Sequence, residues 1–213
     1  MPAPYIQELS TLLFSSPPPF IYVEDGTNPR FSADSILSTF SSSSSPSPSP
    51  KTNTNIKLAD IDGICAFTPR LIYERTTHQW VGYTPTWKFN EEKGKEGGTC
   101  EVWSMTEEDK LLVRDFSPSG SSSSPLAPLD LVKWNESLDG WLYGIRAVYA
   151  LLVARQAQAA ASTTNSQVQL EREPSTRLVL LVTHPERIKQ SMPELFVALT
   201  RLDELVSLSL LGN

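Results

Sequence analysis

"RLVLLVT", residues 177–183, is the stretch that decides the fold. Its continuous apolar run of leucine and valine has the length of a β-strand, which makes it the clearest strand that the sequence predicts. Parallel sheets covered by helices contain strands of this kind. Downstream, "MPELFVALTRLDELV" has helical spacing and is opened by Pro193, and "VSLSLLGN" at residues 206–213 predicts a last strand.

Strands and helices also alternate upstream of this segment. The predicted strands are "FIYV" at 20–23 and "NIKLADI" at 55–61, and the predicted helices span about 32–40, 68–82 and 137–160. The second of these helices has Thr68 as N-cap, Pro69 at its first position and Gly82 past its end. This order is typical of an α/β domain in which a parallel sheet lies between two helical layers, as in P-loop or Rossmann proteins.

Residues 87–115 are ambiguous in the sequence. "TCEVWSM" at 99–105 and "KLLVRDF" at 110–116 are short apolar runs, and we predict that they pair as a hairpin.

Three polar tracts interrupt the ordered pattern, at residues 41–55, 117–128 and 161–176. They are rich in Ser, Pro, Thr and Gln and bury too little apolar surface to offset the entropy of ordering. The pieces between them are too short to fold alone. We therefore predict one domain over residues 1–213, with these tracts as insertions.

Composition excludes several classes of protein. The formal net charge is −6 and the pI is about 5.0, so the surface as a whole repels nucleic acid. Cys65 and Cys100 lack metal-ligand spacing and fit a reducing compartment, Cys65 as a buried thiol and Cys100 as a loop thiol. No signal peptide or membrane-spanning stretch is apparent, which predicts an intracellular protein.

The segment "FIYVEDGTNPRFSADSIL", residues 20–37, has the strand–turn–helix order of a phosphate-binding loop. Such a loop needs G-x-x-x-x-G-K-[ST], in which Lys reaches phosphate and the hydroxyl binds magnesium. Here "FSA" stands where "GK[ST]" is required, and Arg is a poor substitute for the compact ammonium of Lys. The candidate cofactor-binding positions of this degenerate loop are Gly26, Thr27, Asn28, Arg30 and Ser32.

The second half of such a site is an acid at the end of a later strand, where it orders magnesium and the attacking water. The strand 177–183 ends instead in Thr183, and the nearest following carboxylate is Glu186, beyond Pro185. With both halves defective, we predict no catalytic residue, no metal and no required cofactor, although ATP binding stays open. His184 is interpreted as a surface turn residue.

Two further patterns have simple structural interpretations. "DID" at 60–62 is interpreted as a solvated strand end, not as a catalytic pair of carboxylates. "NES" at 135–137 fits a glycosylation acceptor and, more simply, a helix N-cap.

Three blocks resemble the fifth subunit of the eukaryotic origin recognition complex, especially its fungal members. The blocks are "LADIDGICAFTPRLIYERTTHQW", "SLDGWLYGIRAVYALL" and "RLVLLVTHPERIKQSMPELFVALTRLDELV", and they occur in the family's order. The phrase "PEL…LTRLDEL" is the most specific. The resemblance covers about residues 19–37, 56–82 and 131–213.

This resemblance implies an AAA+ ATPase fold, a place in the nucleus and a role in DNA replication initiation. It implies other origin recognition subunits as partners, and DNA contact through the complex. The family's phosphate-loop positions fall on Gly26 to Ser32, and its magnesium-ordering acid falls on Thr183; neither matches, whereas Glu186 and Arg187 do. The lid and winged-helix domains of the family are absent from the 213 residues, so we expect a sheet that is incomplete at its C-terminus.

The sequence therefore predicts a non-catalytic AAA+-like subunit that acts through protein–protein assembly. Two alternatives stay open: an ATP-binding AAA+ ATPase with an atypical phosphate loop, and a nonfunctional fragment.

Overall fold

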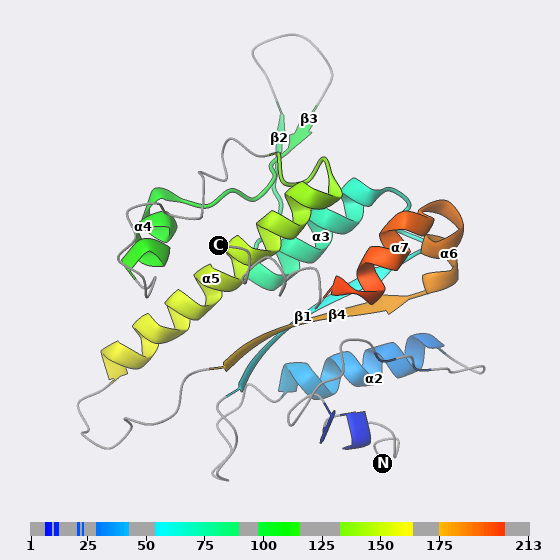
Figure 1. Ribbon diagram of the computed structural model, residues 1–213, viewed down its shortest axis with the longest axis horizontal. Helices are drawn as coiled ribbons and strands as arrows, with labels where there is room; N and C mark the ends of the chain where they lie inside the picture. The colour runs from blue at the N-terminus through cyan, green and yellow to red at the C-terminus, as the bar shows by residue number, and fades with distance from the viewer. Residues whose placement is uncertain are drawn as a thin grey trace. The chain divides into compact units, whose positions relative to one another are not determined.

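Two strands that are far apart in the sequence pair in parallel. A computed structural model describes residues 7–9, 11–12, 21, 23, 29–42, 54–89, 98–115, 133–163 and 175–202. Strand β1 (Thr54–Asp62) lies beside strand β4 (Ser175–Thr183), and the register runs from Thr54 opposite Ser175 to Asp62 opposite Thr183. The parallel pairing predicted from the two apolar runs is confirmed for these strands (Figure 1).

The chain divides into two compact units. The first comprises Met1–Phe67 and Asn165–Asn213, and the second comprises Thr68–Thr164. Within the described residues, the first unit contains the parallel strand pair and the second is mainly helical.

The first unit has a small core on one face of the strand pair. Helix α2 (Pro29–Ser42) packs there through Ile36, together with Leu9 from the helical residues 7–9. Side chains two residues apart in a strand share a face. Four such strand residues pack against Leu9 and Ile36: Ile56, Leu58, Val179 and Leu181. On the opposite face, Ala59 and Ile61 are fully buried, whereas Ile56 and Leu58 on the α2 face are partly buried.

Two short helices follow β4 in the same unit. These are α6 (Pro185–Ser191) and α7 (Pro193–Thr200), which pack against each other. Each begins with a proline at its first position, where the missing N–H costs nothing. The helix predicted from Pro193 is confirmed, and the predicted strand at 206–213 lies outside the described residues.

The second unit is built on two helices, α3 (Pro69–Val81) and α5 (Leu138–Thr163), which pack together. Tyr73 of α3 stacks on Trp141 of α5 with ring centroids 4.8 Å apart. Both predicted helices are confirmed. For α3, the capping is as expected: Thr68 accepts a hydrogen bond from the Leu71 N–H, and Gly82 has the left-handed conformation of a C-cap.

Several predicted elements have to be corrected. Helix α2 begins at Pro29, not at residue 32 or 33, because proline favours the first helical position. Ile21 and Val23 are the described residues of the predicted strand 20–23, and neither belongs to a strand. The tracts at 41–55 and 161–176 are not wholly irregular, since their ends lie in α2, β1, α5 and β4.

The predicted hairpin of 99–105 with 110–116 is wrong. Strand β2 (Trp87–Phe89) pairs antiparallel with β3 (Gly98–Cys100), and residues 107–115 form helix α4 (Glu107–Asp115). The Thr106 hydroxyl accepts from the Asp109 N–H, so the acidic first turn of α4 is a capped helix start. Cys100, expected in a loop, belongs to β3.

Candidate functional site at the carboxyl ends of the parallel strands

The carboxyl ends of β1 and β4 meet, as they must in a parallel pair, and ligands of α/β proteins commonly bind at this edge. Asp62 and Thr183 are the last residues of the two strands and lie opposite each other. The Gly63 N–H continues the ladder by donating to the Thr183 carbonyl at 2.9 Å. The chain therefore stays paired one residue beyond the strand.

The Asp62 carboxylate organises the turn that leaves β1. Its Oδ1 accepts from the Ile64 backbone N–H at 2.9 Å and from His184 Nδ1 at 3.0 Å. Its Oδ2 is the acceptor for the Cys65 thiol at 3.8 Å. The Asp62 carbonyl also accepts from the N–H groups of Cys65 and Ala66. Both carboxylate oxygens are thus engaged by the protein.

These contacts change the acidity of the carboxyl group. Burial by itself raises the pKa of Asp62, but the hydrogen bonds from Ile64, His184 and Cys65 and the charge of His184 together outweigh it. The net effect is a lowered pKa, which keeps Asp62 ionised and able to hold the turn.

His184 has an unusual backbone conformation. Its φ of 52° and ψ of 51° lie in the left-handed region, which costs energy in a residue that has a Cβ. It occupies the N-cap position of α6 but makes no capping hydrogen bond, because its ring turns to Asp62. The ring is about a third exposed. The Asp62 contact helps to offset this local strain.

The described residues that were expected to form a nucleotide site lie in three elements: α2, the end of β4 and α6. Arg30 lies in the first turn of α2, and Ser32 is buried in the same helix at 4% exposure. Thr183 directs its hydroxyl to the Ile61 carbonyl at 3.4 Å, within the strand pair. Glu186 is exposed in the first turn of α6. Gly26, Thr27 and Asn28 lie outside the described residues.

The site that the structure does assemble was not predicted. Asp62 was interpreted as a solvated strand end and His184 as a surface turn residue, yet each is the other's partner. The rule that parallel strands align their carboxyl ends could have found the pair, because both residues end or follow the two clearest strands. Cys65, expected to be buried, is exposed in the turn at hydrogen-bonding distance from Asp62.

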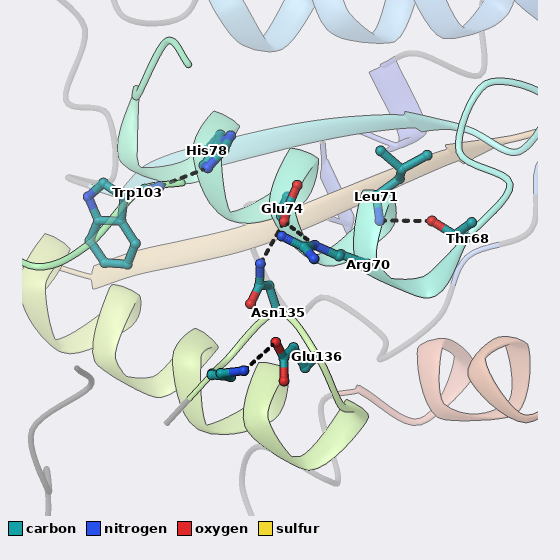
Figure 2. A network of polar contacts seen from close by, with 9 residues as sticks. Thr68, Arg70, Leu71, Glu74, His78, Trp103, Asn135 and Glu136 are labelled. Atoms are coloured by element: carbon teal, nitrogen blue, oxygen red, sulfur yellow. Dashed lines mark hydrogen bonds and ion pairs between the residues drawn. The ribbon is translucent and has the colours of Figure 1, made fainter. Parts of the chain in front are cut away.

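A second polar network lies in the helical unit (Figure 2). Glu74 of α3 accepts from Arg70 Nε at 2.7 Å and from the Asn135 side-chain amide at 2.6 Å. The hydrogen bond and charge of Glu74 raise the pKa of Arg70. Asn135 is buried, so the glycosylation interpretation of "NES" does not fit its surroundings. Ser137 instead caps α5, its hydroxyl accepting from the Gly140 N–H at 3.1 Å.

One contact ties a further segment to the same helix. The Trp103 backbone N–H donates to Nε2 of His78, which is in the last turn of α3, at 3.2 Å (Figure 2). Figure 2 shows the contacts of His78 and Glu74 arranged along α3, so this helix holds both residues 101–105 and residues 133–137.

Neither network contains a recognisable metal centre. Within the described ranges, no three His, Cys, Asp or Glu side chains are grouped so that they could hold a metal ion. In that same part of the chain, no helix combines the length and apolarity needed to cross a membrane.

Comparison with protein-family models, with curated proteins and with solved structures finds no match for this chain.

Proposed function

We propose that this chain is a non-catalytic AAA+-like subunit of the origin recognition complex, which contributes to DNA replication initiation in the nucleus through protein–protein assembly. Other subunits of that complex are its partners, and it meets DNA through them. The proposal also takes the β1–β4 pair to be part of a larger parallel sheet with helices on both faces.

Two features support the assignment to this family. Two of the three blocks that resemble the family, the first and the third, begin within β1 and β4, and these strands pair in parallel along nine positions. The third block continues from β4 into α6 and α7, and its most specific phrase begins at Pro193, the first residue of α7.

The proposal that the chain is non-catalytic depends mainly on Asp62, whose two carboxylate oxygens already accept hydrogen bonds within the protein. At the edge where a phosphohydrolase needs a carboxylate to order magnesium and water, β4 ends in Thr183. The neighbouring carboxylate, Asp62, has both oxygens engaged in holding its own turn and His184. Recruiting it for metal binding would require these contacts to break.

The test is affinity purification of the tagged full chain from its own cells, followed by identification of co-eluting proteins. We expect origin recognition subunits in the eluate. Their absence would refute the assembly role, and aggregation without any partner would favour a nonfunctional fragment.

Nucleotide binding is measured separately on the purified chain with Mg²⁺–ATP. We expect no saturable binding below millimolar concentrations and no hydrolysis. Tight binding that is lost in Arg30→Ala, with Arg75→Ala on the exposed face of α3 as the matched control, would instead establish an ATP-binding protein with an atypical loop.

A further inference from the structure

His78 is a buried histidine that acts as an acceptor for the main chain. It is 7% exposed, and its Nε2 accepts the Trp103 N–H at 3.2 Å. Because Nε2 accepts this bond, it carries no proton, and the ring proton of the neutral form is on Nδ1. This hydrogen bond thereby fixes the tautomer of His78 and the position of the Trp103 backbone.

Aromatic side chains surround this imidazole. The Tyr83 ring lies 5.0 Å away in a tilted arrangement, and the Trp134 ring lies 6.4 Å away edge-on. Trp103 and Trp134 are themselves buried, with ring centroids 6.3 Å apart. A charged imidazolium in this setting loses its hydration, and attraction to the rings offsets only part of that loss.

Burial accordingly lowers the pKa of His78, and the charge of Glu74 opposes this shift without cancelling it. The Glu74 carboxylate also accepts hydrogen bonds from Arg70 and Asn135, which reduces the effect of its charge on His78. Among the charged groups of the other adjoining segments, Glu101 is contacted by the Thr86 hydroxyl, and Lys133 and Glu136 pair at the surface.

We propose that His78 is a proton-sensitive latch that holds the segment of residues 101–105 on α3. A proton from solvent binds the Nε2 lone pair, which removes the acceptor of the Trp103 N–H and places a second donor in its way. The segment with its buried Trp103 and Met105 then separates from α3 as the pH falls. This regulation is independent of any assembly role.

The experiment is amide hydrogen exchange of the full chain between pH 7.5 and 5.5, expressed as protection factors to remove the intrinsic pH dependence. We expect protection of the Trp103 amide to fall by up to about tenfold at pH 5.5, one pH unit below the ordinary His pKa of about 6.5, because the released imidazole binds a proton that the buried one does not. Amides in the middle of α3 should lose much less protection.

The chain has two histidines, so each can be removed in turn. His78→Gln keeps an acceptor near the Nε2 position but does not titrate, and it should leave Trp103 protection independent of pH. His184→Gln should retain the wild-type response. An unchanged fall in His78→Gln, a uniform loss across α3, or no fall in the wild type would each overturn the latch.

A measurement on the wild type keeps the test decisive if a variant does not fold. Nitrogen-15 chemical shifts of the imidazole report the tautomer and its titration midpoint. The latch requires the Nδ1–H tautomer at pH 7.5 and a midpoint below about 6.5, the ordinary value for His; the opposite tautomer would refute it.

Discussion

Gly63 shows how closely the ends of β1 and β4 approach. A Cβ at this position would overlap the His184 carbonyl oxygen and come within 3.1 Å of Ile188 Cγ1. His184 directly follows β4, and the preceding residue, Thr183, accepts the Gly63 N–H through its carbonyl oxygen. The absence of a side chain at Gly63 therefore permits this close approach of the His184 backbone.

Gly63→Ala should lower the free energy of unfolding by about 2–3 kcal/mol, because main chain has to move to admit the methyl group. The matched control is Gly82→Ala, where nothing lies within 4 Å but φ is +72°. That control should cost about 1–2 kcal/mol, from the left-handed backbone alone. Urea denaturation of both variants measures the difference, and equal costs would contradict the close approach at Gly63.

At the scale of elements, α3 is held by polar side chains as well as by its apolar face. Asn135 precedes α5 and donates to Glu74 in the middle of α3, which joins the lead-in of one helix to the side of the other. Helix α4 is joined to α5 in a comparable way, by the ion pair of Asp109 with Arg155 at 2.9 Å. These contacts fix which helix faces which.

Asn135→Asp should destabilise the chain by about 2–3 kcal/mol at pH 7, because a donor bonded to a carboxylate becomes a second carboxylate in a buried position. The control is Glu136→Gln, which breaks the surface pair with Lys133 and should change stability by less than about 0.5 kcal/mol. Thermal and urea unfolding provide the comparison. A small effect of Asn135→Asp would mean that this contact does not organise the two helices.

Helix α4 also shows why the prediction failed at this scale. "KLLVRDF" has three consecutive apolar residues, a pattern that fits a strand or a helix equally. The capping by Thr106 and the three acids of the first turn favoured the helix, and they were the better signal. Val113 is buried while Leu111 is exposed, so one face of a short helix is covered.

For the whole molecule, the two histidine-linked sites predict acid sensitivity in two separate pH ranges. Burial lowers the pKa of His78, so the unfolded chain binds its proton more readily. The stability from neutral His78 is therefore present above about pH 6.5 and is lost as the pH falls toward the folded pKa. The lowered pKa of Asp62 contributes stability above its ordinary value of 3.8, which is lost below that value.

The thermal unfolding midpoint, measured from pH 7.5 to 3, should thus decrease in two steps, one below about pH 6.5 and one below about pH 3.8. His78→Gln should flatten the upper range and leave the lower one, and Asp62→Asn should do the reverse. If both variants follow the wild-type curve throughout, other groups control the acid response and neither assignment holds.

Much of the local structure was determined by the sequence alone. The strand at 177–183, the caps of α3 and the capped start of α5 each depend on neighbouring residues: an apolar run, Thr68 with Pro69 and Gly82, and Ser137. These features arise from steric effects and hydrogen bonds between residues close in the sequence, so each can be predicted from its own segment. The departure from the phosphate-loop motif likewise lies in the order of residues 26–32 and in the Thr183 that ends the strand.

Only the tertiary structure decided which side chains meet. Asp62 and His184 are 122 residues apart, and His78 and Trp103 are 25 apart. Their contacts depend on strand register and helix packing, which bring together groups that no local pattern relates. These surroundings then determine the protonation of each group. Desolvation lowers the pKa of His78, and hydrogen bonds lower the pKa of Asp62 and so keep it ionised.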